Sequence, residues 1–140
     1  MKKLIITISL IIFSFIGEAQ FVQKLINVGD AYFTTQVFSY KIAIFDSVKS
    51  DFVWTGEREM NTIIQIGGGL IFIDGGCKGE YKIEGQAKII KDWEQDAIDY
   101  KCKDEQGVTC IVTAIYCKRT KTSSLSIVYS DTIFMYNVQN

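Results

Sequence analysis

The chain has 140 residues, of which 48% are hydrophobic, and its 15 basic and 16 acidic side chains leave a formal net charge of −1. This near-neutral balance lacks the basic stripe by which most proteins attract nucleic acid, so no nucleic-acid partner is expected. The chain also has no His, which removes the commonest general base, the commonest transition-metal ligand and every Ser-His or Cys-His nucleophile pair. Composition therefore lowers the expectation of catalysis.

Residues 1–19 have the organisation of a secretory signal peptide. Two lysines at residues 2–3 precede an uncharged, mostly apolar run at residues 4–16, and small residues follow at Gly17 and Ala19. The apolar run is shorter than the ~20 residues that a membrane-spanning helix needs. We therefore expect cleavage after Ala19, no membrane anchor in the mature chain, and a periplasmic or secreted protein.

The remaining segment, residues 20–140, is expected to form a single domain with the two-residue alternation of β-strands. Strands are expected at residues 38–44, 60–66, 70–74, 81–84, 89–90, 108–117, 124–129 and 132–138. Residues 21–32 and 92–97 are ambiguous, and the first of these segments has room for a short helix. Short strands at close spacing predict an all-β fold, a single antiparallel barrel or sandwich of about eight strands, lipocalin-like or a similar meander.

Three connections between these strands have the composition of hairpin turns. Residues 104–107, Asp-Glu-Gln-Gly, fit a type I turn followed by a left-handed Gly. Residues 130–131 have the length of a two-residue hairpin loop. The three glycines at residues 67–69 lack the G-x-x-x-x-G-K-[ST] spacing of a phosphate-binding loop, and no helical pattern follows them, so a turn is expected there as well.

The four cysteines, Cys77, Cys102, Cys110 and Cys117, are expected to form disulfides in an exported chain. Cys110 and Cys117 lie on one predicted strand, about 23 Å apart at strand rise, whereas a disulfide needs Cα atoms roughly 4.4–6.8 Å apart. The turn at residues 104–107 places Cys102 opposite Cys110, within bridging distance. Cys77 and Cys117 then remain as the second pair. The spacing contains no C-x-x-C, which argues against a zinc site.

Asp92, Glu94, Asp96 and Asp99 form an acidic cluster. The Asp-x-Glu-x-Asp pattern resembles the start of a calcium loop, but the Gly and Glu that an EF-hand needs further along are absent, so only an improvised calcium site remains as an alternative. Two of these carboxylates could instead serve as acid and nucleophile across a glycosidic bond. Nothing in the pattern indicates a cleft, so a solvated strand edge or loop is expected, with neither a metal ion nor a cofactor.

The aromatic residues raise the question of a binding platform, because aromatic rings stack on sugars and anchor interfaces. They also prefer strands and fill barrel interiors. We therefore expect most of them, Trp54 and Trp93 included, in the core. Tyr116, Tyr129 and Tyr136 are expected to pack across strands with their hydroxyl groups at the rim.

Two segments carry a resemblance to a known group of proteins. Residues 100–111 read YKCKDEQGVTCI and residues 125–138 read LSIVYSDTIFMYNV, and the leader ends in Ala19-Gln20. Together they resemble small exported β-proteins of Bacteroidota. The resemblance covers the C-terminal third, and the rest only as a strand pattern. It implies an exported β-rich fold and no known activity, so no functional residue is carried over.

Two functions fit these features. The first is a non-catalytic binding or interaction module whose partner is a protein, a glycan or a small apolar ligand. The second is a small hydrolase that acts on a glycan through carboxylates such as Asp92 and Glu94. A closed barrel with an apolar interior would favour the first function, whereas a cleft flanked by two facing carboxylates would favour the second.

Overall fold

The computed structural model describes residues 21–28, 32–74 and 79–139. The described chain forms one helix and ten strands. They are α2 (Phe21–Val28), β1 (Phe33–Asp46), β2 (Asp51–Trp54), β3 (Arg58–Gly67), β4 (Leu70–Asp74), β5 (Gly79–Ile83), β6 (Lys88–Lys91), β7 (Gln95–Lys103), β8 (Thr109–Cys117), β9 (Thr122–Val128) and β10 (Thr132–Val138). The predicted signal peptide at residues 1–19 lies outside the described residues.

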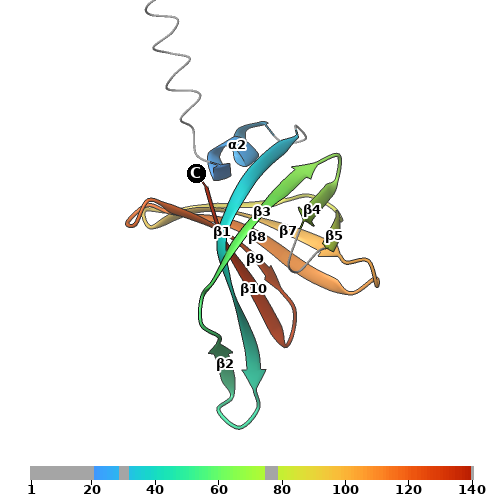
Figure 1. The fold of residues 1–140 in the computed structure, drawn as a ribbon. Coiled ribbons are helices and arrows are strands. Elements are labelled where there is room, and N and C mark those ends of the chain that lie inside the picture. Colours follow the sequence, from blue (N-terminus) through green and yellow to red (C-terminus); the bar gives the residue numbers. More distant parts are fainter. Residues whose placement is uncertain (1–20, 29–31, 75–78, 140) are drawn as a thin grey trace, which may run out of the picture.

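Eight of the strands close into an antiparallel barrel in the order β1, β3, β4, β5, β7, β8, β9 and β10 (Figure 1). Closure comes from β10, which pairs back to β1 from Val37–Val138 to Ile44–Thr132. β2 continues the sheet beside the far end of β1, and β6 pairs only with β7. The prediction of an all-β antiparallel fold of about eight strands is confirmed, and of its two forms the chain adopts the barrel.

Alternate side chains of each strand face the barrel interior, as the pleat requires. Every barrel strand contributes buried apolar side chains, among them Val37, Ile64, Ile71, Tyr81, Ile98, Val112, Leu125 and Tyr136. On β7 the alternation is plain, because Tyr100 and Cys102 are buried while Lys101 and Lys103 are exposed. The interior is therefore an apolar core assembled from strands distant in sequence.

The three predicted hairpin turns are confirmed. Gly68 and Gly69 have φ values of 61° and 77°, which a type I′ turn requires at both of its central residues. Gly107 has a φ of 78°, and the Asp104 carboxylate accepts hydrogen bonds from the backbone amides of residues 106 and 108. The loop at residues 130–131 is closed by the amide of Tyr129, which donates to the Thr132 carbonyl over 2.8 Å.

The ambiguous segment near the N-terminus begins with α2. The helix buries Phe21, Val22 and Leu25 against the barrel core, where it contacts β7 and β8. It lies across one end of the barrel, close to the start of β1 (Figure 1). Within the described residues, no helix has the length and apolarity needed to cross a bilayer.

Candidate functional site

A cavity of about 290 Å³ lies between α2 and the barrel wall, and we refer to it as the α2 cavity. Its described lining residues are Leu25 of α2, Ile66 to Gly69 of the β3–β4 hairpin, Ile83 and residues 85–87 between β5 and β6, and Ile98 and Tyr100 of β7. Four of these residues, Leu25, Ile66, Ile98 and Tyr100, are buried members of the core. The cavity therefore reaches the interior packing, and its volume lies near the lower end of small-molecule pockets.

The opening results from an interruption in the β-ladder on one edge of β7. β5 pairs with β7 at only two positions, the last of them Ile83 with Cys102. β6 resumes the pairing at Lys88 with Asp99, so residues 84–87 lie opposite only two residues of β7. Gly85, with a φ of 72°, allows the chain to turn there. The extra residues leave Tyr100 and Ile98 accessible from the cavity.

Tyr100 is the polar side chain of this lining that lies in the core. Its side chain is 7% exposed, and its hydroxyl has no hydrogen-bond partner among the described residues. Burial, and next the nearby Cys102 thiol, raise the pKa of Tyr100 to about 12. The hydroxyl therefore stays protonated near neutral pH, and it is available as a hydrogen-bond donor.

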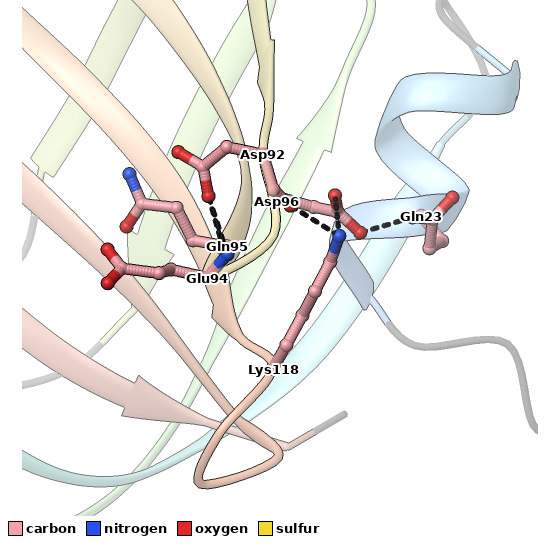
Figure 2. Close-up of polar contacts among 6 residues, drawn as sticks. All are labelled: Gln23, Asp92, Glu94, Gln95, Asp96 and Lys118. Atoms are coloured by element: carbon pink, nitrogen blue, oxygen red, sulfur yellow. Dashed lines mark hydrogen bonds and ion pairs between the residues drawn. The ribbon is translucent and has the colours of Figure 1, made fainter.

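The acidic cluster does not form one site (Figure 2). Asp96 is 4% exposed and turns toward α2, where Gln23 Nε2 donates to its Oδ2 over 2.6 Å. Its Oδ1 lies 3.3 Å from Lys118 Nζ, which also donates to the Asp92 carbonyl over 2.5 Å. The expectation of a solvated face is thus wrong for Asp96, because this carboxylate connects α2, β7 and the turn after β8.

The other acidic residues of the cluster have separate environments. Asp92 and Glu94 are exposed, as expected, and Asp92 Oδ1 accepts the backbone amides of Glu94 and Gln95. Asp99 is half-buried and accepts a hydrogen bond from Thr113 Oγ1 over 2.8 Å. None of the four carboxylates lines the α2 cavity. Within the described ranges, no group of three or more His, Cys, Asp or Glu side chains could hold a metal ion.

Replacing Asp96 by Ala is expected to lower the free energy of unfolding by about 1.5–3 kcal/mol, because a buried charged acceptor and its partners are lost. Glu94→Ala is the matched control, since this exposed carboxylate has no side-chain partner among the described residues and the expected change is within about 0.5 kcal/mol. Urea unfolding measures both variants, and hydrogen exchange at residues 21–28 reports on α2. An Asp96→Ala change no larger than that of the control would show that the carboxylate does not hold the helix.

The predicted register of the two inner cysteines is confirmed, because Cys102 lies directly opposite Cys110 on β7 and β8. Both are buried free thiols in this structure, so the predicted disulfide is not formed in it. Cys117 is also a free thiol and lies opposite Gln95. Cys77 falls outside the described residues, and its pairing with Cys117 stays a prediction.

The ends of β4 and β5, which flank residues 75–78, bear on the predicted disulfide between Cys77 and Cys117. Asp74 ends β4 and Gly79 begins β5, and Gly79 lines a small pocket together with Asp104 and Tyr129. Both strand ends therefore lie at the same end of the barrel as the 104–107 turn. Cys117 ends β8 at the opposite end, about 23 Å from Cys110 at strand rise.

The three described thiols are expected to differ in reactivity in the reduced, folded protein. Hydrogen bonds from Thr120 and the nearby Arg119 lower the pKa of Cys117, whereas burial and the neighbouring Cys110 raise the pKa of Cys102 to about 12. Because the thiolate is the nucleophile, iodoacetamide near neutral pH should modify Cys117 at least about tenfold faster than Cys102. Mass spectrometry of digests taken over time measures the order. Equal rates in the folded protein, as expected only after denaturation, would contradict it.

The aromatic predictions are met in part. Tyr136 stacks on Tyr40 of β1 and Tyr129 packs edge-to-face on Phe134 of β10, so the prediction of cross-strand packing is confirmed for these two. Tyr116 packs against the core. The hydroxyl of Tyr136 is buried and does not lie at the rim. The expectation of core positions is wrong for Trp54 and Trp93, which are exposed, because the first lies on the outer strand β2 and the second in the turn before β7.

Sequence reasoning missed the α2 cavity and Tyr100. The alternation of Ile98, Tyr100 and Cys102 could have indicated an inward-facing tyrosine, but it carries no sign of a cavity beside the ring. No family model, no curated protein and no solved structure matches the chain. The geometry of this cavity is therefore the feature that points to a function.

Proposed function

We propose that the protein is a non-catalytic binding module that holds a small apolar ligand in the α2 cavity. The observation that carries this proposal is an apolar cavity of about 290 Å³ that reaches buried core residues of a closed barrel. Ligand pockets are usually concave, largely preformed and lined mostly by apolar side chains with a few polar groups. The α2 cavity has this character, with Tyr100 as its buried polar group.

The alternative is a hydrolase that acts on a glycan through carboxylates of the acidic cluster, and it has less support. Asp96 is engaged by Gln23 and Lys118, and Asp92 Oδ1 accepts the amides of its own turn. A larger depression of about 420 Å³, lined by Lys24, Thr34 and Gln36 among others, offers a protein or glycan partner a more polar surface but fewer buried core residues.

We further propose that the protein acts after export, in the periplasm or outside the cell, without a membrane anchor. The support is the pattern of residues 1–19, a basic pair, a short apolar run and small residues at Gly17 and Ala19. The mature chain should then begin at Gln20. Intact mass of the exported protein is the test, and a mass that retains residues 1–19 in the membrane fraction would overturn this proposal.

Binding in the α2 cavity is tested with N-phenylnaphthylamine, a neutral fluorescent probe whose emission rises in apolar surroundings. Ala87→Phe, which fills the cavity, should weaken probe binding at least about tenfold, a difference of ~1.4 kcal/mol. Ile89→Phe is the matched control, because Ile89 is exposed on β6 and does not line the cavity. Equal probe binding by both variants, or none by the parent protein, would contradict the proposed function.

We also propose that Cys102 and Cys110 become joined as a disulfide in the exported protein. Their opposed positions and the oxidising compartment that the leader predicts support this. A loop this short is worth about 2–3 kcal/mol in the chain-entropy model. The double variant Cys102→Ala with Cys110→Ala should therefore melt at a lower temperature than the oxidised protein yet still fold. Non-reducing peptide mapping decides the pairing, and a bond between Cys77 and Cys110 would refute it.

A further inference from the structure

Tyr100 differs from the other polar groups buried beside the core. The Asp96 carboxylate has Gln23 and Lys118 as partners. The Tyr129 hydroxyl donates to Asp104 Oδ2 over 2.9 Å. The Tyr100 hydroxyl has no such partner among the described residues, although only 7% of its side chain is exposed. The hydroxyl keeps some exposed surface, so a ligand in the cavity that carries an acceptor can receive its hydrogen bond in place of water.

The walls of the cavity select against charge. Its described lining consists of aliphatic side chains, glycines, Gln86 and Tyr100, with no charged side chain among them. Burial is the main cause that raises the pKa of Tyr100, which means that these surroundings disfavour an anion. A carboxylate or an ammonium group bound there would lose its hydration without gaining a described partner of opposite charge.

The size of the cavity sets the scale of the ligand. An apolar cavity of roughly 150 Å³ suffices for benzene. The α2 cavity, at about 290 Å³, therefore encloses a single ring with a short chain, or an aliphatic chain of similar volume. Because it is open on one side, a larger probe such as N-phenylnaphthylamine can bind with part of its ring system outside the cavity.

We propose that the ligand is a neutral apolar molecule with one hydrogen-bond acceptor, such as a carbonyl or ether oxygen, that receives the hydroxyl of Tyr100. This inference rests on the proposed function and names the ligand class of that same cavity. The apolar walls supply most of the affinity, and the tyrosine orients the ligand by its one polar atom.

Three probes with the same carbon chain on a phenyl ring test this inference: propylbenzene, propiophenone and hydrocinnamate. They present no acceptor, a neutral carbonyl and a carboxylate, respectively. Dissociation constants come from NMR titration of the folded protein. Tyr100→Phe should raise the constant for propiophenone about two- to tenfold, the usual range for one neutral hydrogen bond, and leave that for propylbenzene unchanged. Hydrocinnamate should bind at least about tenfold more weakly than propiophenone.

Tyr116→Phe is the control, because this partly buried tyrosine lies on β8 and does not line the cavity. It should leave all three constants unchanged. Equal loss of propiophenone and propylbenzene binding in Tyr100→Phe, or no loss of either, would overturn the inference, as would tight binding of hydrocinnamate. The proposed function would survive those results provided that Ala87→Phe still weakens probe binding at least about tenfold. Absence of binding by all three ligands and by N-phenylnaphthylamine would instead overturn the proposed function.

Discussion

Replacing Tyr136 by Ala is expected to lower the free energy of unfolding by about 3–5 kcal/mol, the usual cost of truncating a buried aromatic side chain. Tyr136 is the largest fully buried side chain of the described chain. It lies on β10 opposite Tyr40 of β1 and Leu125 of β9, and its ring stacks on that of Tyr40 with centroids 6.3 Å apart. The truncation thus leaves a cavity at the seam that closes the barrel.

Tyr32→Ala is the matched control for Tyr136, because it removes the same side chain from an exposed position before β1. Its expected effect is within about 0.5 kcal/mol. Urea unfolding monitored by circular dichroism measures both free energies. A loss below about 1 kcal/mol in Tyr136→Ala would show that the seam repacks around the missing ring, which would contradict a central place for Tyr136 in the core.

Replacing Leu25 by Ala is expected to lower the free energy of unfolding by about 2–5 kcal/mol and to weaken probe binding in the α2 cavity. Leu25 is 1% exposed, belongs to the hydrophobic core and lines the cavity. It therefore holds the helix on the barrel and forms one wall of the binding site. Both readouts should change together, because the same contact serves stability and binding.

Leu70→Ala is the control for Leu25, since Leu70 is exposed at the start of β4 and does not line the α2 cavity. Thermal melts and N-phenylnaphthylamine titrations of both variants give the two readouts. Hydrogen exchange then locates the change, and faster exchange is expected at residues 21–28 with the strands still protected. A stable Leu25→Ala protein with unaltered probe affinity would show that α2 does not form a wall of the site.

The hairpins of the C-terminal half could be predicted from the sequence because their information is local. A Gly at residue 107 and an Asp at residue 104 specify the turn, and the two-residue period of the strands then places Cys102 opposite Cys110. The same logic predicted the turns at residues 67–69 and 130–131. In these hairpins each strand is determined by its neighbour in the chain.

The course of β1 could not be read from the same alternation. Phe38, Tyr40, Ile42 and Ile44 are in phase in the sequence, yet Phe38 is exposed. The cause is a bulge in the pairing after Val37, which shifts the register with both neighbouring strands. An inserted residue moves the following side chains to the other face, so Val37 is buried although it is out of phase with Tyr40. Neither a Gly nor a charge marks the bulge.

The α2 cavity could not be predicted from the sequence either, because it depends on contacts between distant segments. The α2 cavity exists because α2 docks on β7, because the β3–β4 hairpin ends beside it, and because β5 and β6 leave a gap in the ladder. Asp96 was expected to be solvated for the same reason, since its burial depends on Gln23 and Lys118, which are distant in the sequence. Such sites are properties of the assembled barrel and leave no periodic signal.

Closure of the barrel by β1 and β10 has a kinetic consequence. The pairing of Val37 with Val138 joins strands near the two ends of the described chain. The entropic cost of closing so long a loop is therefore high. Folds dominated by such non-local pairs fold in milliseconds to seconds, and we expect β1 with β10 to be the last seam to form. Until then β1 and β10 each present an open edge, which other chains can join. Aggregation during refolding should therefore depend on protein concentration, and a short peptide with the sequence of β10 should compete for the open edge of β1.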